Sequence, residues 1–317
     1  MALSFPMYRK TAHAALCGIL LVVAALGVGI PAQAQGLRAK LAERTQAAAP
    51  LPPGVQKIAD VPYGPDARQR MDIYRPTTNP SGTRAPVIFM VHGGGWYTGD
   101  KAIGRVVDHK VARWVPRGLI LVSVNYRLLP DTPVSQQVQD VAQALATAQQ
   151  QAAQWGGDAG RFILMGHSAG AHLVSLINAQ PALAQRLGAW PWLGTVSLDS
   201  AVLNVPQFMR APHLPLYDDA FGTNPVYWHA MSPFHQWVSG APPYQFVCST
   251  ERPDQPCLQA QAMAQHVQMQ GGRAEVLPQP LTHGEINAEL GLDSDYTRAV
   301  EGFMASLDLV VAQKLGR

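Results

Sequence analysis

The chain has 317 residues, a formal net charge of +3, and 14% charged against 47% hydrophobic residues. This composition predicts a well-buried globular protein, and the length suits one α/β domain with insertions. A nearly balanced charge argues against nucleic-acid binding and against electrostatic attachment to a membrane.

The first 34 residues have the pattern of an export signal. Arg9 and Lys10 precede an apolar run over residues 14–30, and residues 32–34 (AQA) match a small-x-small cleavage site. The apolar run of about 17 residues is also at the lower limit for a membrane-spanning helix. Because the cleavage pattern favours removal, we expect an exported protein, periplasmic or secreted, with no stable membrane anchor.

Residues 35–56 are expected to form a flexible leader, and residues 57–317 the folded domain. Apolar and polar side chains alternate over residues 57–64 and 70–76, which predicts a first antiparallel pair of strands. The pattern then predicts a strand over residues 85–91, a helix over 101–117, a strand over 119–126 and a helix over 133–155.

The sequence GHSAG at residues 166–170 follows an apolar run (161–165) and precedes a helical stretch (171–177). A G-x-S-x-G turn between a strand and a helix holds its serine in a strained conformation, and the glycines relieve crowding of the backbone. The hydroxyl then projects above the sheet at a helix start, where developing negative charge is favoured. Ser168 is therefore a candidate nucleophile for acyl transfer.

The second half of the chain continues the alternation of strands and helices. Residues 204–240 break this pattern and are rich in Pro, His, Phe, Tyr and Trp, which predicts either a cap over the active site or packing against the sheet edge. Strands are expected over 194–199, 244–249 and 274–277, and helices over 256–270 and 295–315. Such alternation predicts a largely parallel sheet.

A glycine-rich turn, residues 92–96 (HGGGW), follows the strand at 85–91. Glycines after a strand expose backbone N–H groups that can donate to an oxyanion. The order of the two turns fits a third strand that ends in this loop and a fifth strand that ends in the nucleophile. The alternative is an ordinary loop, with Ser168 only a helix N-cap.

A serine nucleophile needs a base, and the base needs an orienting carboxylate. Among ten histidines, His283 follows the last predicted strand on a loop that returns over the carboxyl edge of the sheet. His167 adjoins the serine, but neighbouring residues on a sharp turn point apart. His172 is expected to pack or cap, and the three histidines of the 204–240 segment could line a substrate pocket. His283 is the predicted base.

The predicted acid is Asp254, which lies just past the strand that ends at Ser249. Glu251 and Asp199 are the alternatives, and Asp254 could instead be a helix N-cap. Cys248 and Cys257, on either side of this loop, predict a disulfide in an exported protein, the alternative being two buried thiols. The bond would brace the loop that carries Asp254.

With these residues in hand, the chain resembles the α/β-hydrolase superfamily, in the branch of carboxylesterases and arylformamidases (kynurenine formamidase-like) near the hormone-sensitive-lipase group. The matching motifs are the turns at 92–96 and 166–170, the sequence YRLLP at 126–130, and the surroundings of Asp254 and His283. The resemblance implies a mostly parallel sheet of the eight-stranded type flanked by helices, with a small cap around residues 204–240.

The resemblance also implies an oxyanion hole made by the N–H groups of Gly94, Gly95 and Ala169. Trp96 and His167, beside the two turns, are the candidate substrate-binding residues. The export signal and the cysteine pair are unusual beside intracellular formamidases and argue against a role in tryptophan breakdown.

The expected function is that of a serine carboxylesterase that hydrolyses small esters through an acyl-enzyme. An amidase of the formamidase type with the same triad, or a binding protein that has kept a hydrolase fold, are the alternatives. We expect a small-molecule substrate, no cofactor and no metal, because no His or Cys pair lies at ligand spacing near the cysteines. The sequence gives no oligomeric state.

Overall fold

The computed structural model describes residues 49–78, 82–200 and 202–317. The predicted export signal and all but the end of the predicted leader lie outside these residues.

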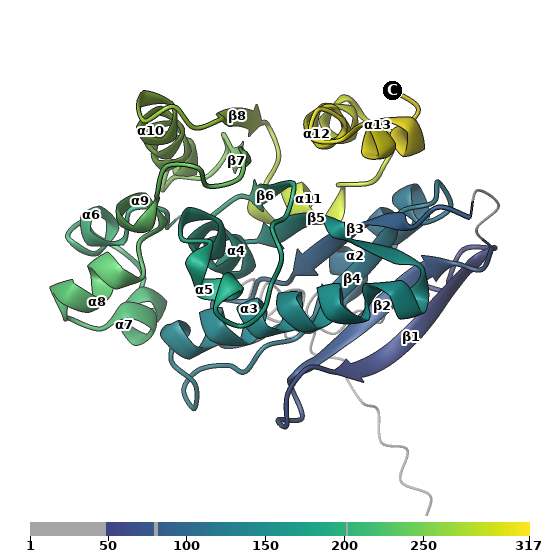
Figure 1. Cartoon of the computed structure of the whole chain (residues 1–317). Coiled ribbons are helices and arrows are strands. Elements are labelled where there is room, and N and C mark those ends of the chain that lie inside the picture. The colour runs from purple at the N-terminus through teal and green to yellow at the C-terminus, as the bar shows by residue number, and fades with distance from the viewer. Residues whose placement is uncertain (1–48, 79–81, 201) are drawn as a thin grey trace, which may run out of the picture. The chain divides into compact units, whose positions relative to one another are not determined.

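The core is a single sheet with the strand order β1-β2-β4-β3-β5-β6-β7-β8 (Figure 1). The predicted first pair is antiparallel, β2 also runs antiparallel to β4, and every later pairing is parallel. The strands are β1 (Val55–Pro62), β2 (Arg70–Pro76), β3 (Ala85–Val91), β4 (Ile120–Val124), β5 (Gly157–His167), β6 (Gly194–Leu198), β7 (Tyr244–Ser249) and β8 (Ala274–Gln279). The predicted, mostly parallel eight-stranded sheet is confirmed.

The central strands are buried on both faces, as their continuous apolar sequences require. Every residue of β3, β4, β6 and β7 is buried. Alternate side chains of β3 enter different clusters: Val87 and Phe89 belong to one core, and Ile88 and Met90 to the other. The sheet therefore separates two hydrophobic layers.

Helices cover both faces of the sheet (Figure 1). The layer of Val87 and Phe89 is closed by α3 (Val134–Gln151), α4 (Ala169–Ala179) and α5 (Ala182–Gln185). The layer of Ile88 and Met90 is closed by α2 (Gly104–Trp114), α11 (His283–Ala288), α12 (Asp295–Ala305) and α13 (Leu309–Leu315). A short 3-10 turn, η1 (Ala152–Trp155), extends α3, and α10 (Pro256–Met269) packs against β7 and β8.

The strand register brings four loops together at one edge of the sheet. Val91 pairs with Gly166, His167 with Leu198, and Leu198 with Val247. The loops that follow β3, β5, β6 and β7 therefore begin side by side at the carboxyl ends of parallel strands, the usual place for a site in such sheets.

The predicted insertion consists of four short helices between β6 and β7. Each has a proline in its first turn, where the missing N–H costs no hydrogen bond. They are α6 (Val205–Met209), α7 (Pro215–Phe221), α8 (Pro225–Ala230) and α9 (Pro233–Gln236). Phe221 is buried against Trp96 of the glycine-rich turn, with ring centroids 5.1 Å apart. The segment thus forms a cap over that turn.

The prediction of one helix over residues 295–315 was wrong, because two helices, α12 and α13, occupy this range. Asp308 separates them, since its carboxylate accepts hydrogen bonds from the N–H groups of Val310 and Val311 at 2.8 and 3.1 Å. An Asp that caps a new helix start ends the preceding helix.

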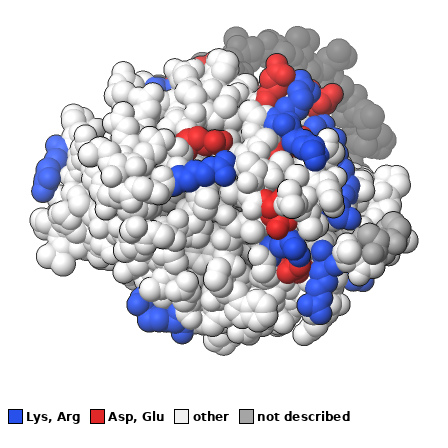
Figure 2. Space-filling model, turned by 45° about the horizontal axis from the view of Figure 1, so that its top comes forward, with Lys and Arg blue, Asp and Glu red and all other residues white. Residues whose placement is uncertain are grey.

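Charged side chains do not form one basic surface on the face shown in Figure 2. Blue and red groups are interspersed toward one side, and most of the remainder of this face is uncharged. Within the described residues, no helix is both long enough and apolar enough to cross a membrane.

Candidate active site

Ser168 lies at the turn between β5 and α4, as predicted. Its backbone has φ 56° and ψ −119°, a strained conformation for a residue with a side chain, and it precedes the first residue of α4. The N–H of Ser168 donates to the carbonyl of Leu198 at 3.0 Å, so the turn is fixed to the end of β6. This bond uses only the backbone of Ser168 and not its hydroxyl.

The two glycines of the motif are required by close approach of the backbone. A β-carbon on Gly166 would lie 2.4 Å from the carbonyl oxygen of Gly170. One on Gly170 would lie 2.3 Å from the carbonyl oxygen of Val91 and 2.5 Å from that of His92. Only glycine allows α4 to start this close to β5 and to the end of β3.

His283 is placed against the serine, 115 residues away in sequence. Its Nε2 lies 2.9 Å from Ser168 Oγ, within hydrogen-bond distance. His283 is the first residue of α11 rather than part of a loop, because Thr282 and Glu285 form a reciprocal capping box that fixes the start of this helix. The histidine is partly exposed, so a substrate can reach the pair.

Asp199, and not Asp254, holds the other side of the imidazole. Asp199 Oδ2 lies 2.5 Å from His283 Nδ1, and Asp199 Oδ1 accepts the N–H of Ser249 at 2.8 Å. The preferred sequence prediction, Asp254, is therefore wrong in geometry. Asp254 is exposed and its carboxylate is paired with Arg252, on the far side of the guanidinium from the histidine.

The strand register explains why Asp199, and not Asp254, reaches His283. Asp199 directly follows Leu198 of β6, which is hydrogen-bonded between β5 and β7, so its side chain enters the site from the strand beside the nucleophile. Its φ of 53° turns the chain sharply at this point. Asp199 had been an alternative, and the only sequence signal for it was its position at the end of a buried strand.

The carboxylate of Asp199 stays ionised although it is fully buried. Burial raises its pKa, but the hydrogen bond from His283 and the charge of Arg252 outweigh burial and lower the pKa to about 2. An ionised acid at this place keeps the proton on His283 Nδ1 and leaves Nε2 as the acceptor that faces Ser168.

Arg252 is a further charged group at the site. Its Nη1 donates to Asp199 Oδ2 at 2.8 Å and to the carbonyl oxygen of Asp199 at 3.2 Å, and lies 3.0 Å from His283 Nδ1. Its Nε donates to Asp254 Oδ1 at 2.9 Å, while Nη2 binds the other oxygen of this carboxylate at 2.5 Å. The sequence predicted no role for Arg252. The one signal for it was its position between two candidate acids, Glu251 and Asp254.

Cys248 and Cys257 are joined by a disulfide, with Cα atoms 5.2 Å apart. The bond closes the loop that carries Arg252 and Asp254, between the end of β7 and the start of α10. The two cysteines are thus not separate thiols in this structure. The expected brace is present, although the group that it presents to the triad is Arg252 and not Asp254.

The glycine-rich turn packs directly against the serine. A β-carbon on Gly93 would lie 2.9 Å from Ser168 Cβ. The carbonyl oxygen of Gly93 accepts a hydrogen bond from His92 Nδ1 at 2.8 Å. The carbonyl oxygen of Gly94 accepts from Thr98 N at 3.0 Å and from Thr98 Oγ1 at 3.1 Å. Because a trans peptide points its N–H opposite to its C=O, these bonds turn the N–H groups of Gly94 and Gly95 away from the loop.

The three predicted oxyanion donors are Gly94, Gly95 and Ala169. Among the described residues, none accepts a hydrogen bond from their N–H groups. Ala169 is the first residue of α4, where an N–H has no partner inside the helix. The three groups therefore have the free donors that an oxyanion hole needs, beside the nucleophile.

His92 holds this turn as a neutral residue. Burial lowers the pKa of His92 to about 4, so its ring is uncharged at neutral pH. The ring stacks on Tyr126, with centroids 4.6 Å apart, and the Tyr126 hydroxyl donates to the His92 carbonyl oxygen at 3.0 Å. This contact accounts structurally for Tyr126 in the sequence motif YRLLP.

Trp96 and His167, the candidate substrate-binding residues, make their described contacts with other protein groups. Trp96 is 3% exposed and packs edge-on against Tyr217 and Phe221 of the cap. His167 Nε2 bonds the carbonyl oxygen of His283 at 2.8 Å, and the two rings lie 4.5 Å apart. Burial lowers the pKa of His167 well below its usual value. Because a carbonyl oxygen can only accept, Nε2 is the nitrogen that donates. Trp96 thus joins the glycine-rich turn to the cap, and His167 holds the backbone of His283. Contact of either residue with a substrate stays a prediction.

The cap approaches the predicted oxyanion hole through α7. Leu216 Cδ1 would lie 3.6 Å from a β-carbon on Gly95, so this side chain borders the space in front of the glycine. His172 packs in the interior, one of its two predicted roles: it is buried, and its Nε2 bonds the carbonyl oxygen of Met231 at 2.8 Å.

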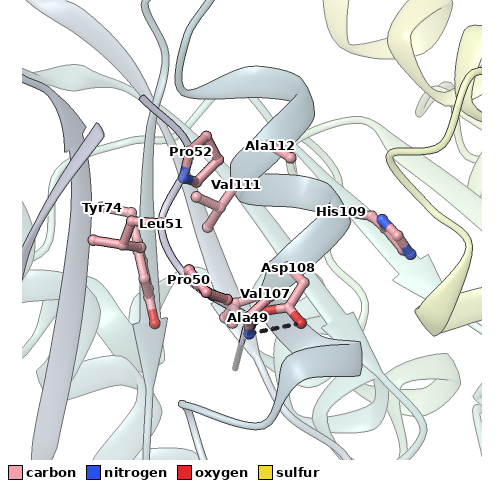
Figure 3. Close-up of a pocket in the computed structure, with 10 residues that line it drawn as sticks. All are labelled: Ala49, Pro50, Leu51, Pro52, Tyr74, Val107, Asp108, His109, Val111 and Ala112. Carbon is pink, nitrogen blue, oxygen red and sulfur yellow. Dashed lines mark hydrogen bonds between the residues drawn. The ribbon is translucent and has the colours of Figure 1, made fainter. Parts of the chain in front are cut away.

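A separate cavity of about 190 Å³ lies between residues 49–52, β2 and α2 (Figure 3). Figure 3 shows Tyr74 on one side and Val111 on another, with Asp108 bonded to the N–H of Ala49. None of the triad residues lines it. Within residues 49–78, 82–200 and 202–317, no cluster of three His, Cys, Asp or Glu side chains could hold a metal ion.

Comparison with known proteins gives relatives that are esterases. The family model BD-FAE matches residues 71–190. Esterase LipQ of Mycobacterium tuberculosis is 32% identical over 222 residues, which cover 66% of this chain and 52% of LipQ. A probable isoprenylcysteine α-carbonyl methylesterase of Oryza sativa, ICMEL1, is 35% identical over 130 residues, or 41% of this chain and 29% of that protein.

Among solved structures, esterase B from Lactobacillus rhamnosis superposes with a TM-score of 0.69 at 20% identity, covering 89% of this chain and 93% of that one. The chain has the α/β-hydrolase fold. It spans about half the length of LipQ and less of ICMEL1.

Within this fold, the structure brings together Ser168 and His283 as expected and adds two residues, Asp199 and Arg252. Both additions depend on strand order. Asp199 follows β6, which lies beside β5, and Arg252 follows β7, which lies beside β6. The predicted oxyanion donors lie beside the serine, while Asp254 is displaced outward by Arg252.

Proposed function

We propose that this α/β-hydrolase is a serine carboxylesterase that hydrolyses small carboxylic esters through an acyl-enzyme. The observation that carries the proposal is the continuous chain of hydrogen bonds from Ser168 Oγ through His283 to Asp199, with distances of 2.9 and 2.5 Å. A hydroxyl, an imidazole and an ionised buried carboxylate in this order make a nucleophile at neutral pH.

In the proposed reaction, Ser168 Oγ attacks the carbonyl carbon of the ester while His283 Nε2 accepts the hydroxyl proton. The tetrahedral intermediate collapses, the bond to the alcohol oxygen breaks, and His283 returns the proton to the leaving alkoxide. A water molecule, deprotonated by His283, then attacks the acyl carbon. The bond from this carbon to Ser168 Oγ breaks, His283 returns the proton to Oγ, and the carboxylic acid leaves. Asp199 stabilises the imidazolium in both halves and is not itself protonated.

The N–H groups of Gly94, Gly95 and Ala169 act as the oxyanion hole in this proposal. Their free donors and the position of the glycine-rich turn against Ser168 support the assignment. Such fixed donors are already oriented when negative charge develops on the oxygen, and each contributes about 3–4 kcal/mol to lowering the barrier.

The relatives support an ester as the substrate, since their names describe esterases and methylesterases. Leu216 in front of Gly95 supports small acyl or alcohol groups, because its side chain limits the depth of the site on that side. The disulfide and the signal-like first 34 residues support export to the periplasm or beyond.

Relative rates on two substrate classes test the function. We expect purified protein to hydrolyse p-nitrophenyl acetate and p-nitrophenyl butyrate with a kcat/KM at least about a hundredfold above that for N-formylkynurenine, a difference of about 2.7 kcal/mol in transition-state stabilisation. Faster turnover of the formamide would assign the triad to an amidase, and no turnover of either class would leave a binding protein.

A further inference from the structure

One group outside the proposed triad, Arg252, contacts its acid, and a second, Asp254, contacts Arg252; both come from the disulfide-closed loop. Arg252 has 15% of its side chain exposed, and its guanidinium lies between the buried carboxylate of Asp199 and the exposed carboxylate of Asp254. The Cys248–Cys257 bond ties both ends of the segment that carries the two loop residues.

The contacts of Arg252 leave it little freedom. Nη1 is shared by the side chain and the carbonyl of Asp199, at 2.8 and 3.2 Å, while Nε and Nη2 form a two-point contact with Asp254. A planar guanidinium fixed at both ends defines the position of every oxygen that it binds. The oxygen bound on the inner side, Asp199 Oδ2, is the one that accepts from His283 Nδ1.

Arg252 offsets one of the two negative charges in this group. Asp199 and Asp254 carry one negative charge each and Arg252 one positive charge, so the three leave one net negative charge next to the imidazole. Removing Arg252 alone would leave a buried carboxylate with the Ser249 N–H and His283 as its described hydrogen-bond partners. A buried charge that loses its partner is costly and tends to move toward water.

We propose that Arg252 is a positioning residue of the esterase: anchored by Asp254 and by the disulfide loop, it fixes Asp199 Oδ2 against His283 Nδ1. This inference rests on the proposed function. Asp254 then acts as the outer anchor of the guanidinium, and the disulfide helps to hold Asp199 in place. Neither Asp254 nor the disulfide contacts His283.

Three substitutions separate the parts of this proposal. Arg252→Met keeps the length of the side chain but removes its charge and donors. Arg252→Lys restores the charge without the two-ended guanidinium. Asp254→Asn leaves Arg252 in place and weakens only its outer anchor. Arg186→Met, at an exposed arginine after α5 for which no partner is found among the described residues, is the matched control.

Rates are expressed per reactive serine, titrated with a fluorophosphonate, so that unfolded protein does not enter the comparison. We expect Arg252→Met to lower kcat on p-nitrophenyl acetate at least about tenfold, or about 1.4 kcal/mol, with KM changed less than about twofold. Arg252→Lys should recover part of the loss, Asp254→Asn should lose about threefold or less, and Arg186→Met should match the wild type.

The far-downfield proton resonance of His283 Nδ1–H gives a second readout that does not need turnover. We expect it to shift or broaden in Arg252→Met and to stay in place in Arg186→Met. Wild-type kcat per titrated serine together with an unchanged resonance in Arg252→Met would overturn the proposal, even if this variant were less stable. If the wild-type protein turned over no ester, the proposed function would fail, and the resonance alone would still support or overturn the role of Arg252.

Discussion

Three residues with side chains hold a left-handed backbone around the site. Trp96, Ser168 and Asp199 have φ values of 63°, 56° and 53°, and each follows the end of a different parallel strand. Such conformations are unfavourable for residues other than glycine and persist only where the surrounding contacts fix them. Here each directs one component of the site: the turn after β3, the proposed nucleophile and the proposed acid.

The two aspartates near His283 differ in what they bind, and their amide variants should therefore differ in activity. Asp199→Asn keeps the shape but no longer holds the proton on His283 Nδ1, so we expect kcat to fall by about 10³ to 10⁴. Asp254 has no contact with His283, so Asp254→Asn should lose about threefold or less. Initial rates on p-nitrophenyl acetate measure both; the reverse order of losses would restore Asp254 as the acid.

At the scale of elements, the strands were predictable because they are continuous apolar runs between turn residues. The segments at 85–91, 194–199 and 244–249 were predicted within one residue of β3, β6 and β7. The acid was not predictable in the same way, because Asp199 and Asp254 each follow a strand. Only the register, which sets Leu198 between His167 and Val247, decides which carboxylate reaches the histidine.

The cap and the end of the chain show another limit of the sequence. Residues 204–240 gave no helical period, because α6 to α9 are four to seven residues long, too short for a periodic pattern to be visible. The 295–315 segment gave one helical pattern, since the apolar period of α12 continues into α13 across Asp308.

The contact between α4 and β3 gives a prediction at this scale. A methyl group on Gly170 would lie 2.3 Å from the Val91 carbonyl oxygen, so Gly170→Ala should push the helix from the strand and lower the free energy of unfolding by at least about 2 kcal/mol. Gly302→Ala, in the interior of α12, meets its nearest atom at 3.5 Å and serves as the control. It should change stability by no more than about 1 kcal/mol, in the stabilising direction. Urea unfolding that gave equal values for both variants would contradict the steric account.

For the whole molecule, buried neutral histidines set the response of stability to acid. Burial lowers the pKa of both His92 and His172 to about 4, from 6.5 in the unfolded chain. Between these values the unfolded chain binds more protons, so the free energy of unfolding falls as pH drops from 6.5 toward 4 and levels off below it. Each histidine contributes up to about 3 kcal/mol to this loss.

Urea unfolding at pH 7.5 and pH 5 measures this loss, at values above the range in which most carboxylates titrate. We expect a clear fall in the free energy of unfolding, and a smaller fall in His172→Phe, which keeps an aromatic ring without a titrating group. Equal stability at the two pH values in the wild type would mean that these histidines are not buried as described.

The central claim is that Ser168 carries the acyl group, and trapping the covalent enzyme tests it most directly. Protein treated with a fluorophosphonate, and protein quenched in acid during turnover of p-nitrophenyl acetate, should each gain one adduct, mapped by peptide mass spectrometry to Ser168. Ser168→Ala should gain none and lose ester hydrolysis, and His283→Ala should form it far more slowly. Continued hydrolysis by Ser168→Ala, or an adduct on another residue of the active protein, would contradict the account.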